Sequence, residues 1–148
     1  METVYIRACT AHDIDVVCDM QERWAEENIT YGFSPANRVD LAERLGSYFS
    51  VAEISDEIVG FCYGSAHVSE DLAIFPPGEQ YLEVDDIYVI PEFRNRDVGS
   101  ALLKALVHTA QENGVQRFLV YSATKDFQRI VSFYQDHGFR PWCVMMFR

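Results

Sequence analysis

The sequence lacks any long hydrophobic run. Its longest apolar stretches, Ile58 to Tyr63 and Trp142 to Phe147, are far below the ~20 residues that a membrane-spanning helix needs. The first residues carry no cationic segment, long apolar core or small-residue cleavage site of the kind that marks a secretory signal peptide. We therefore expect a protein that does not enter the membrane and that stays in the cytoplasm.

Glycine and proline are scarce as well, with 8 and 5 among 148 residues. Hydrophobic residues make up 49% of the chain and charged residues 24%, which is the composition of a folded domain and excludes a disordered segment. The chain has no internal repeat, low-complexity tract or linker. We expect a single domain over residues 1–148.

Cysteine is rare and irregularly spaced. Cys9, Cys18, Cys62 and Cys143 form neither a C-x-x-C pair nor a disulfide framework, and the histidines show no metal-ligand spacing. This pattern favours a reducing compartment and predicts that the protein holds no metal.

Positive charge is in short supply, with 12 Lys and Arg against 23 Asp and Glu and a net charge of -11. Nucleic-acid binding depends on positive charge, so we expect no nucleic-acid partner. Residues 1–92 hold 19 of the acids and 4 of the bases, whereas residues 93–148 hold 4 acids and 8 bases. One interpretation is a site whose second half meets an anionic ligand and whose first half meets a cationic one; the other is an acidic surface without a ligand.

The hydrophobic pattern predicts alternating strands and helices. Strands are expected over Tyr5 to Ala8, Val51 to Ile54, Ile58 to Ser65, Tyr81 to Ile90, Phe118 to Tyr121 and Trp142 to Phe147. Helices are expected from a capping box at Thr10 to about Asn28, from Ser34 and Pro35 through Phe49, from Val98 to Asn113, and from Asp126 to His137. This order predicts a mixed α/β or α+β sandwich of sheet and helices.

The segment Asp85 to Leu103 is the most informative part of the sequence, because a strand enters a tight loop and then a helix start. Unpaired N–H groups and the helix dipole make such a turn an anion site, and Arg94 and Arg96 add positive charge. Gly99 permits close backbone approach, and Ser100 offers a further donor. A pyrophosphate suits this turn; an ordinary structural connector is the alternative.

This segment, together with Ser132 to Phe139, strongly resembles the GNAT superfamily of acyl-CoA-dependent N-acetyltransferases, and the resemblance covers most of the chain. It implies a mixed, mostly antiparallel sheet of six to seven strands, splayed at its central strands and flanked by about four helices. The family's phosphate loop, Gln/Arg-x-x-Gly-x-Gly/Ala, fits two registers, Arg94 to Gly99 and Arg96 to Ala101. The flanking residues favour the first, which puts Asp97 where the family has its first glycine.

The resemblance implies acetyl-CoA as co-substrate. The backbone of Ile87, Tyr88 and Val89 would pair with the pantetheine arm. The pyrophosphate would lie against Arg94, Asn95, Arg96, Asp97, Val98, Gly99 and Ser100. Tyr134 matches the family's tyrosine near the thioester and is our candidate general acid; a core-facing aromatic is the alternative.

Attack on a thioester requires a neutral amine, so a group must remove a proton from the ammonium form. Glu83 and Asp85 lie two residues apart on a strand and so share a face, and both positions resemble those where relatives use a carboxylate base. Asp86 points to the other face in a regular strand, although a bulge would exchange the faces. A solvated strand edge is the alternative for all three.

The first two helices grip the acceptor in the family, which by resemblance implicates Trp24, Glu27 and Tyr31. Acids interleaved with aromatics suit a cationic amine, and an amphipathic helix with a solvated face is the other explanation. We expect an N-acetyltransferase that acts on a small polyamine-like or aminoglycoside-like amine by direct transfer in a ternary complex.

Two other functions are compatible with the sequence. Asp97, Phe127 and Ile130 depart from the family pattern, which keeps open a non-catalytic acyl-CoA-binding sensor or interaction module. Acetylation of a protein or peptide would use the same co-substrate machinery. The apolar segment Trp142 to Phe147 could pair between subunits, so we also expect a homodimer.

Overall fold

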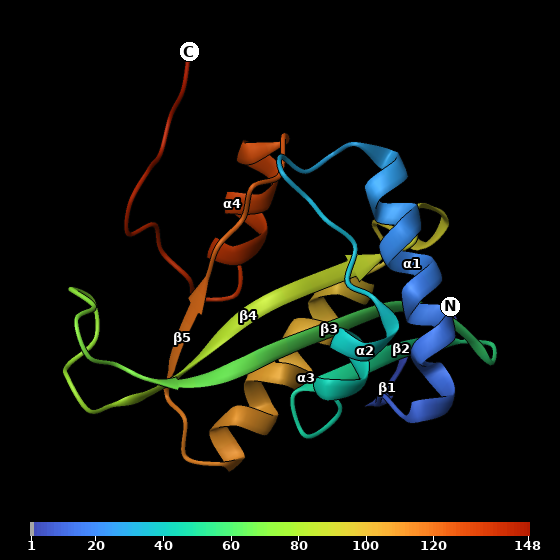
Figure 1. The fold of residues 1–148 in the computed structure, drawn as a ribbon, viewed down its shortest axis with the longest axis horizontal. Helices are drawn as coiled ribbons and strands as arrows, with labels where there is room; N and C mark the ends of the chain where they lie inside the picture. Colours follow the sequence, from blue (N-terminus) through green and yellow to red (C-terminus); the bar gives the residue numbers. More distant parts are fainter. Residues whose placement is uncertain (1) are drawn as a thin grey trace.

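The computed structural model describes residues 2–148 and contains one sheet with helices on both sides (Figure 1). The strands are β1 (Tyr5–Ala8), β2 (Phe49–Ile54), β3 (Glu57–Val68), β4 (Gln80–Val89) and β5 (Arg117–Val120). The α-helices are α1 (Ile14–Glu27), α2 (Arg38–Glu43), α3 (Val98–Glu112) and α4 (Phe127–Gln135). Two short 3-10 turns, η1 (Ala11–Asp13) and η2 (Pro91–Phe93), precede α1 and follow β4.

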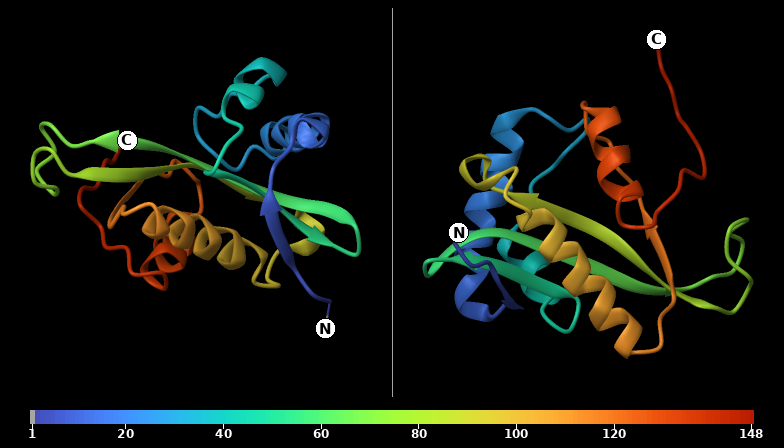
Figure 2. Two further views of the ribbon diagram at one scale, coloured as in Figure 1. Left: turned by 90° about the horizontal axis from the view of Figure 1, so that it is seen from below. Right: turned by 180° about the vertical axis from the view of Figure 1, so that it is seen from behind.

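The five strands lie in chain order, β1-β2-β3-β4-β5. All neighbouring pairs are antiparallel except β4 and β5, which are parallel. Helices α1 and α2 cover one face of the sheet, and α3 and α4 cover the other (Figure 2). The mixed, mostly antiparallel sheet with four flanking helices confirms the predicted fold class.

The predicted splay lies between β4 and β5, at one end of the five-stranded sheet rather than at its centre. Strand β5 pairs with β4 only from Tyr81 to Val84, whereas β4 continues to Val89. The two strands diverge beyond this point in Figure 1. The β5-facing edge of β4 is therefore left without a ladder partner from Asp85 to Val89.

Local sequence signals account for the main helix boundaries. The Asp13 carboxylate accepts a hydrogen bond of 2.8 Å from the Thr10 backbone N–H, which is one half of the predicted capping box. Helix α1 ends at Asn28, whose left-handed backbone (φ 54°) stops the helix where the sequence predicted. On α3, the residues Leu102, Leu103 and Leu106 are buried against the sheet.

Two predicted elements differ in the structure. The sheet has five strands rather than six to seven, and the segment Trp142 to Phe147 is not a strand. In this segment Met145 is 96% exposed. An apolar run becomes a strand only when a neighbouring strand supplies hydrogen-bond partners, and within residues 2–148 none pairs with this one.

The second helix is much shorter than predicted. Asn37, not Ser34 or Pro35, caps α2, because its side chain accepts a 2.9 Å hydrogen bond from the backbone N–H of Asp40. Phe49, which was expected at the end of this helix, opens β2 instead and pairs with Tyr63 on β3. Its ring is fully buried, so burial in the sheet outweighs the helical spacing of the pattern.

Between residues 2 and 148, no helix is both long enough and apolar enough to cross a bilayer. The four cysteines are free thiols, three of them wholly or partly buried. The same residues contain no grouping of three His, Cys, Asp or Glu side chains suited to a metal ion.

Candidate active site

A bulge in β4 decides which side chains face α1 and α2. Tyr63 pairs with Asp86, but the next residue of β3, Gly64, pairs with Val84, so Asp85 is an extra residue in β4. Paired residues project from the same face, and the bulge therefore brings Asp86 to the face that Glu83 occupies. The regular-strand expectation, with Asp86 on the opposite face, is wrong for this reason.

The Asp86 carboxylate is held by two buried polar groups. The Tyr63 hydroxyl donates a hydrogen bond to Oδ2 of Asp86, and Nε2 of Gln21 donates to the same oxygen at 3.2 Å. Nε2 of Gln21 also lies 3.1 Å from the Tyr63 hydroxyl. Burial raises the pKa of the Asp86 carboxyl above its ordinary value, and the two hydrogen bonds only partly offset this effect.

Asp86 and Tyr63 form part of the wall of a cleft of about 500 Å³ next to α2. The cleft is lined by Ser34, Pro35, Ala36, Asp40, Glu43, Arg44, Tyr63 and Asp86. Three of these eight residues are acidic and one, Arg44, is basic, so the cleft suits a cationic group. Its volume lies within the range of small-molecule sites, which is ~300–1,000 Å³.

The two carboxylates that the sequence nominated as bases have other partners. Oδ2 of Asp85 accepts hydrogen bonds from Arg44 at 2.8 Å and from Ser65 at 2.7 Å. The Glu83 carboxylate lies 3.5 Å from Nε2 of His67, further along β4. Burial and then the charge of Asp85 raise the pKa of Glu83. Neither residue lines the cleft.

Tyr134 lies on the other side of the sheet, on α4. Its ring packs edge-on against Phe133 and Phe139, with centroid distances of 5.1 and 5.4 Å, and the residue is only 7% exposed. Burial raises the pKa of the Tyr134 hydroxyl, and the nearby Cys62 and Asp86 groups add to this effect. Since Cys62 pairs with Ile87, Tyr134 is close to the unpaired stretch of β4, across the strand from the cleft.

The turn between β4 and α3 has the geometry of an anion site. Asn95 and Asp97 adopt left-handed backbone angles, with φ of 61° and 62°. Asp97 therefore takes the conformation that glycine would have in the family pattern, and its side chain makes no capping hydrogen bond. Ala101 donates the first hydrogen bond of α3, to the Asp97 carbonyl, so the preceding N–H groups point out of the helix end.

The charged and polar side chains of this turn have different surroundings. Arg94 faces inward, where it contacts Glu27 and donates to the Val89 carbonyl at 2.9 Å. Arg96 lies over the Phe93 ring and remains 54% exposed. Ser100 Oγ lies 2.6 Å from Nε2 of His137. The sequence did not identify His137 as a neighbour of this turn.

The predicted acceptor residues do not form one site. The Trp24 ring is stacked between Phe33 and Tyr88, with centroid distances of 4.2 and 5.2 Å. The Glu27 carboxylate accepts hydrogen bonds from Arg94 and from the Tyr88 hydroxyl, the latter at 2.6 Å. Tyr31 lies apart on the loop after α1, where it is 54% exposed.

Sequence reasoning missed the cleft itself. Tyr63 on β3 and Arg44 at the end of α2 line the cleft, and Gln21 on α1 bonds to its Asp86; no local spacing connects these residues. One signal was available, because Gln21 is a polar side chain on the otherwise apolar stripe of α1. A buried amide at such a position usually has a specific hydrogen-bond partner.

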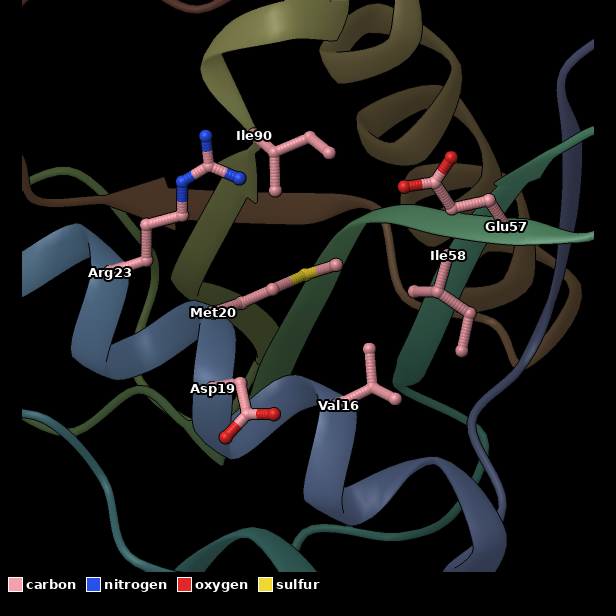
Figure 3. Close-up of a pocket in the computed structure, with 7 residues that line it drawn as sticks. All are labelled: Val16, Asp19, Met20, Arg23, Glu57, Ile58 and Ile90. Carbon is pink, nitrogen blue, oxygen red and sulfur yellow. The ribbon is translucent and has the colours of Figure 1, made fainter.

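A second, smaller cleft of about 190 Å³ lies between α1, the start of β3 and the end of β4 (Figure 3). Met20 projects into it from α1 towards Ile58 and Ile90, with Arg23 and Asp19 at its margin. None of the predicted site residues lines this cleft, which is distinct from the one at Asp86.

The sequence matches a known protein family. Residues 14–139 match the model of the acetyltransferase (GNAT) family. No curated protein sequence matches the chain significantly.

Solved structures with the same fold are distant in sequence. A predicted acetyltransferase from Clostridium acetobutylicum, determined with acetyl-CoA, has 16% identity and a TM-score of 0.70, over 97% of this chain and 96% of the other. A ribosomal-protein-alanine N-acetyltransferase from Brucella melitensis has 16% identity and a TM-score of 0.71, over 99% of both chains. An aminoglycoside acetyltransferase from an uncultured soil metagenomic sample has 17% identity and a TM-score of 0.70, over 98% of this chain and 95% of the other. At these identities the likeness concerns the fold alone.

Proposed function

The chain belongs to the GNAT family of acetyltransferases, and from this premise we propose that it transfers an acetyl group from acetyl-CoA to the primary amine of a small cationic acceptor. The observation that carries the proposal is the unpaired edge of β4, which lies between the acidic cleft at Asp86 and the Tyr134 hydroxyl. An extended ligand arm can pair with such an edge as an added strand.

Acetyl-CoA would bind along this edge and at the turn that follows it. Ile87, Tyr88 and Val89 would offer backbone groups to the pantetheine arm. The backbone of Asn95, Asp97, Val98, Gly99 and Ser100, with the side chain of Arg96, would hold the pyrophosphate. Arg94 would act indirectly by fixing the turn, because its guanidinium is engaged by Glu27 and Val89. The clostridial relative solved with acetyl-CoA supports this choice of co-substrate.

The acceptor would occupy the cleft beside Asp86. Asp40, Glu43 and Asp86 give the cleft an acidic wall that attracts an ammonium group. Trp24 and Glu27 would act on the same region through Tyr88, which both of them contact. Tyr31 would meet only a longer acceptor, because it lies on the loop after α1.

The transfer would be direct, with both substrates bound at once. The amine nitrogen attacks the thioester carbonyl, the C–S bond breaks, and Tyr134 donates a proton to the departing thiolate. Burial raises the pKa of the Cys62 thiol, which keeps it protonated, so a covalent route through this residue is disfavoured.

The test is calorimetric titration with acetyl-CoA, desulfo-CoA and adenosine bisphosphate, followed by turnover with an amine panel. The panel contains diamines, polyamines, aminoglycosides, acidic amino acids and peptides. Phosphate-dependent binding with turnover of the cationic small amines supports the proposal. Binding without turnover indicates a sensor, and turnover of peptides alone indicates a protein acetyltransferase.

We also propose that the enzyme is a cytoplasmic homodimer. The four free thiols suit a reducing compartment, and Val144, Met145 and Phe147 expose apolar surface at one end of the molecule. Light scattering after size-exclusion chromatography should give twice the chain mass of 17.0 kDa. A monomer at high concentration would remove the dimer from the proposal.

A further inference from the structure

The two oxygens of the Asp86 carboxylate have different environments. Oδ2 accepts the hydrogen bonds from Tyr63 and Gln21, and it is the only oxygen of this carboxylate used in bonds among residues 2–148. Asp86 also lines the cleft. The carboxylate is thus anchored through one oxygen and presents the other, Oδ1, as a free acceptor.

The directions of these hydrogen bonds follow from one backbone contact. The Ala36 N–H donates to Oε1 of Gln21 at 3.1 Å, which assigns the oxygen of this fully buried amide and turns its NH₂ group towards Tyr63 and Asp86. The Tyr63 hydroxyl accepts from that NH₂ group at 3.1 Å and therefore uses its own proton for Asp86. Both partners of Asp86 are donors, and hydrogen bonds donated to a carboxylate favour its ionised form, which partly offsets the effect of burial.

Neighbouring carboxylates are less suited to take up a proton in the cleft. Asp85 is engaged by Arg44 and Ser65, and the Arg44 guanidinium in turn lies 4.3 Å from the centre of the Tyr63 ring. Glu83 is outside the cleft, near His67. Asp86 is the one of the three that combines a fixed carboxylate with an oxygen open to the cleft.

We infer that Asp86 is the catalytic residue that accepts the proton of the acceptor ammonium, and that Tyr63 and Gln21 are positioning residues that fix its carboxylate. The inference rests on the proposed function and names the proton acceptor in the same site. It replaces Glu83 and Asp85 in that role. Asp86 and Tyr134 then serve as base and acid on opposite sides of the unpaired stretch of β4.

Acetyl transfer from acetyl-CoA to the acceptor ammonium releases one proton overall. The ammonium gives one proton to Oδ1 of Asp86, and the freed nitrogen lone pair forms the C–N bond as the C–S bond breaks. Tyr134 gives its proton to the thiolate and regains one from the nitrogen of the new amide. Asp86 releases its proton to water, so the net products are the amide, CoA thiol and one proton.

The surroundings of Asp86 favour this role. Burial raises the pKa of Asp86 above its ordinary value, which makes its carboxylate a stronger base than an exposed one. Arg44 opposes this effect with its positive charge, whereas the charge of Asp85 adds to it. Asp40 and Glu43 face the same cleft from α2, and Tyr134 lies beyond β4.

The experiment compares Asp86→Asn with wild type in acetyl transfer to the best amine of the panel, across pH 5–10. Asparagine keeps the shape of the side chain and an oxygen for Tyr63, so the fold should persist; circular dichroism checks this. We expect kcat to fall about 10²–10⁴-fold, as for loss of a general base, with the Kd of acetyl-CoA within about twofold. Asp19→Asn, the same change at an exposed residue of α1 that does not line the acceptor cleft, is the matched control and should retain wild-type rates.

Tyr63→Phe provides an independent readout. Loss of its hydrogen bond removes an influence that lowers the pKa of Asp86. The acidic limb of the kcat/KM profile should therefore move to higher pH, whereas a purely structural role would lower the rate at every pH without moving this limb. Full activity of Asp86→Asn, or loss of the acidic limb in Glu83→Gln or Asp85→Asn instead, would place the base elsewhere and leave the proposed function intact. Absence of wild-type turnover would overturn both.

Discussion

The Arg94 guanidinium and the Glu27 carboxylate face each other in a bidentate ion pair, with hydrogen bonds of 2.7 and 2.8 Å. The pair joins the end of α1 to the turn that follows β4. Burial raises the pKa of Glu27, but the hydrogen bonds from Arg94 and Tyr88 outweigh it, so the pKa lies below its ordinary value. The arginine that the sequence assigned to the pyrophosphate therefore braces the fold.

This arrangement predicts different effects for the two arginines of the turn. Arg94→Met should lower the free energy of unfolding by about 2 kcal/mol, because the half-buried Glu27 loses its charged partner. Arg96→Met should leave unfolding nearly unchanged but weaken acetyl-CoA binding, since Arg96 is exposed beside the candidate pyrophosphate site. Urea denaturation and calorimetry measure the two effects. Equal loss of affinity without loss of stability in Arg94→Met would contradict the bracing role.

Asp13 should make the stability of the fold depend on pH in the acidic range. The hydrogen bonds from Arg7, followed by those from Thr10, overcome burial and lower the pKa of Asp13 from 3.8 to about 2. The ionised carboxylate therefore stabilises the folded state above its unfolded pKa, and this contribution is lost as the pH falls from about 4 towards 2. At pH 7 the free energy of unfolding of wild type should exceed that of Asp13→Asn by about 1–2 kcal/mol. Solvent screening at the partly exposed Arg7 keeps the difference below what the pKa shift alone would give. In urea titrations the difference should vanish near pH 2; a difference independent of pH would argue against the ion pair as its source.

Substitution by alanine should have different effects at two glycines. A Cβ at Gly64 would lie 2.6 Å from the Glu83 carbonyl oxygen, so Gly64→Ala should force β3 and β4 apart at the bulge and reduce both stability and turnover. A Cβ at Gly99 would lie 3.7 Å from the Phe133 ring and 3.9 Å from Cγ2 of Val89, which are ordinary contact distances, so Gly99→Ala should fold normally. It should instead weaken acetyl-CoA binding, because the added methyl group leaves less room for a phosphate to approach the backbone at the helix start. Thermal melts and calorimetry distinguish the two outcomes, and a folding defect in Gly99→Ala would contradict this prediction.

Tyr134→Phe should separate turnover from binding. The ring remains packed against Phe133 and Phe139, so the variant should keep the fold and the Kd of acetyl-CoA. Loss of the hydroxyl should lower kcat about 10²-fold or more, because the thiolate then leaves without a proton donor. Phe139→Leu, which changes the packing of the ring and leaves the hydroxyl in place, is the control for packing. Unchanged kcat in Tyr134→Phe would remove the tyrosine from the mechanism.

Much of the framework was predictable because its determinants are local. The capping pair Thr10 and Asp13, the left-handed stop at Asn28 and the helix start at Val98 depend on residues within one turn of each other. The turn from Arg94 to Ser100 is also local, and the family resemblance was readable from it. The prediction of the α2 boundary was wrong because the burial of Phe49 in β2 outweighs the helical spacing of the pattern.

The candidate site was only partly predictable. The sequence placed three carboxylates on β4, but whether Asp86 faces the acceptor cleft depends on one extra residue in the ladder between β3 and β4. The sequence also nominated Glu27 for the acceptor, whereas its carboxylate meets an arginine 67 residues away. No periodicity within a segment carries information about such a partner.

The sequence by itself determined the order of strands and helices as far as α4, the acidic character of the first half and the turn that marks the family. Each of these depends on periodicity or composition, which neighbouring residues express without tertiary contacts. Only the tertiary structure decided the face of Asp86, the hydrogen bonds that join it to Gln21 and Tyr63, and the inward position of Arg94. These depend on strand register and on long-range packing, because a shift of one residue in a ladder reverses which side chains meet.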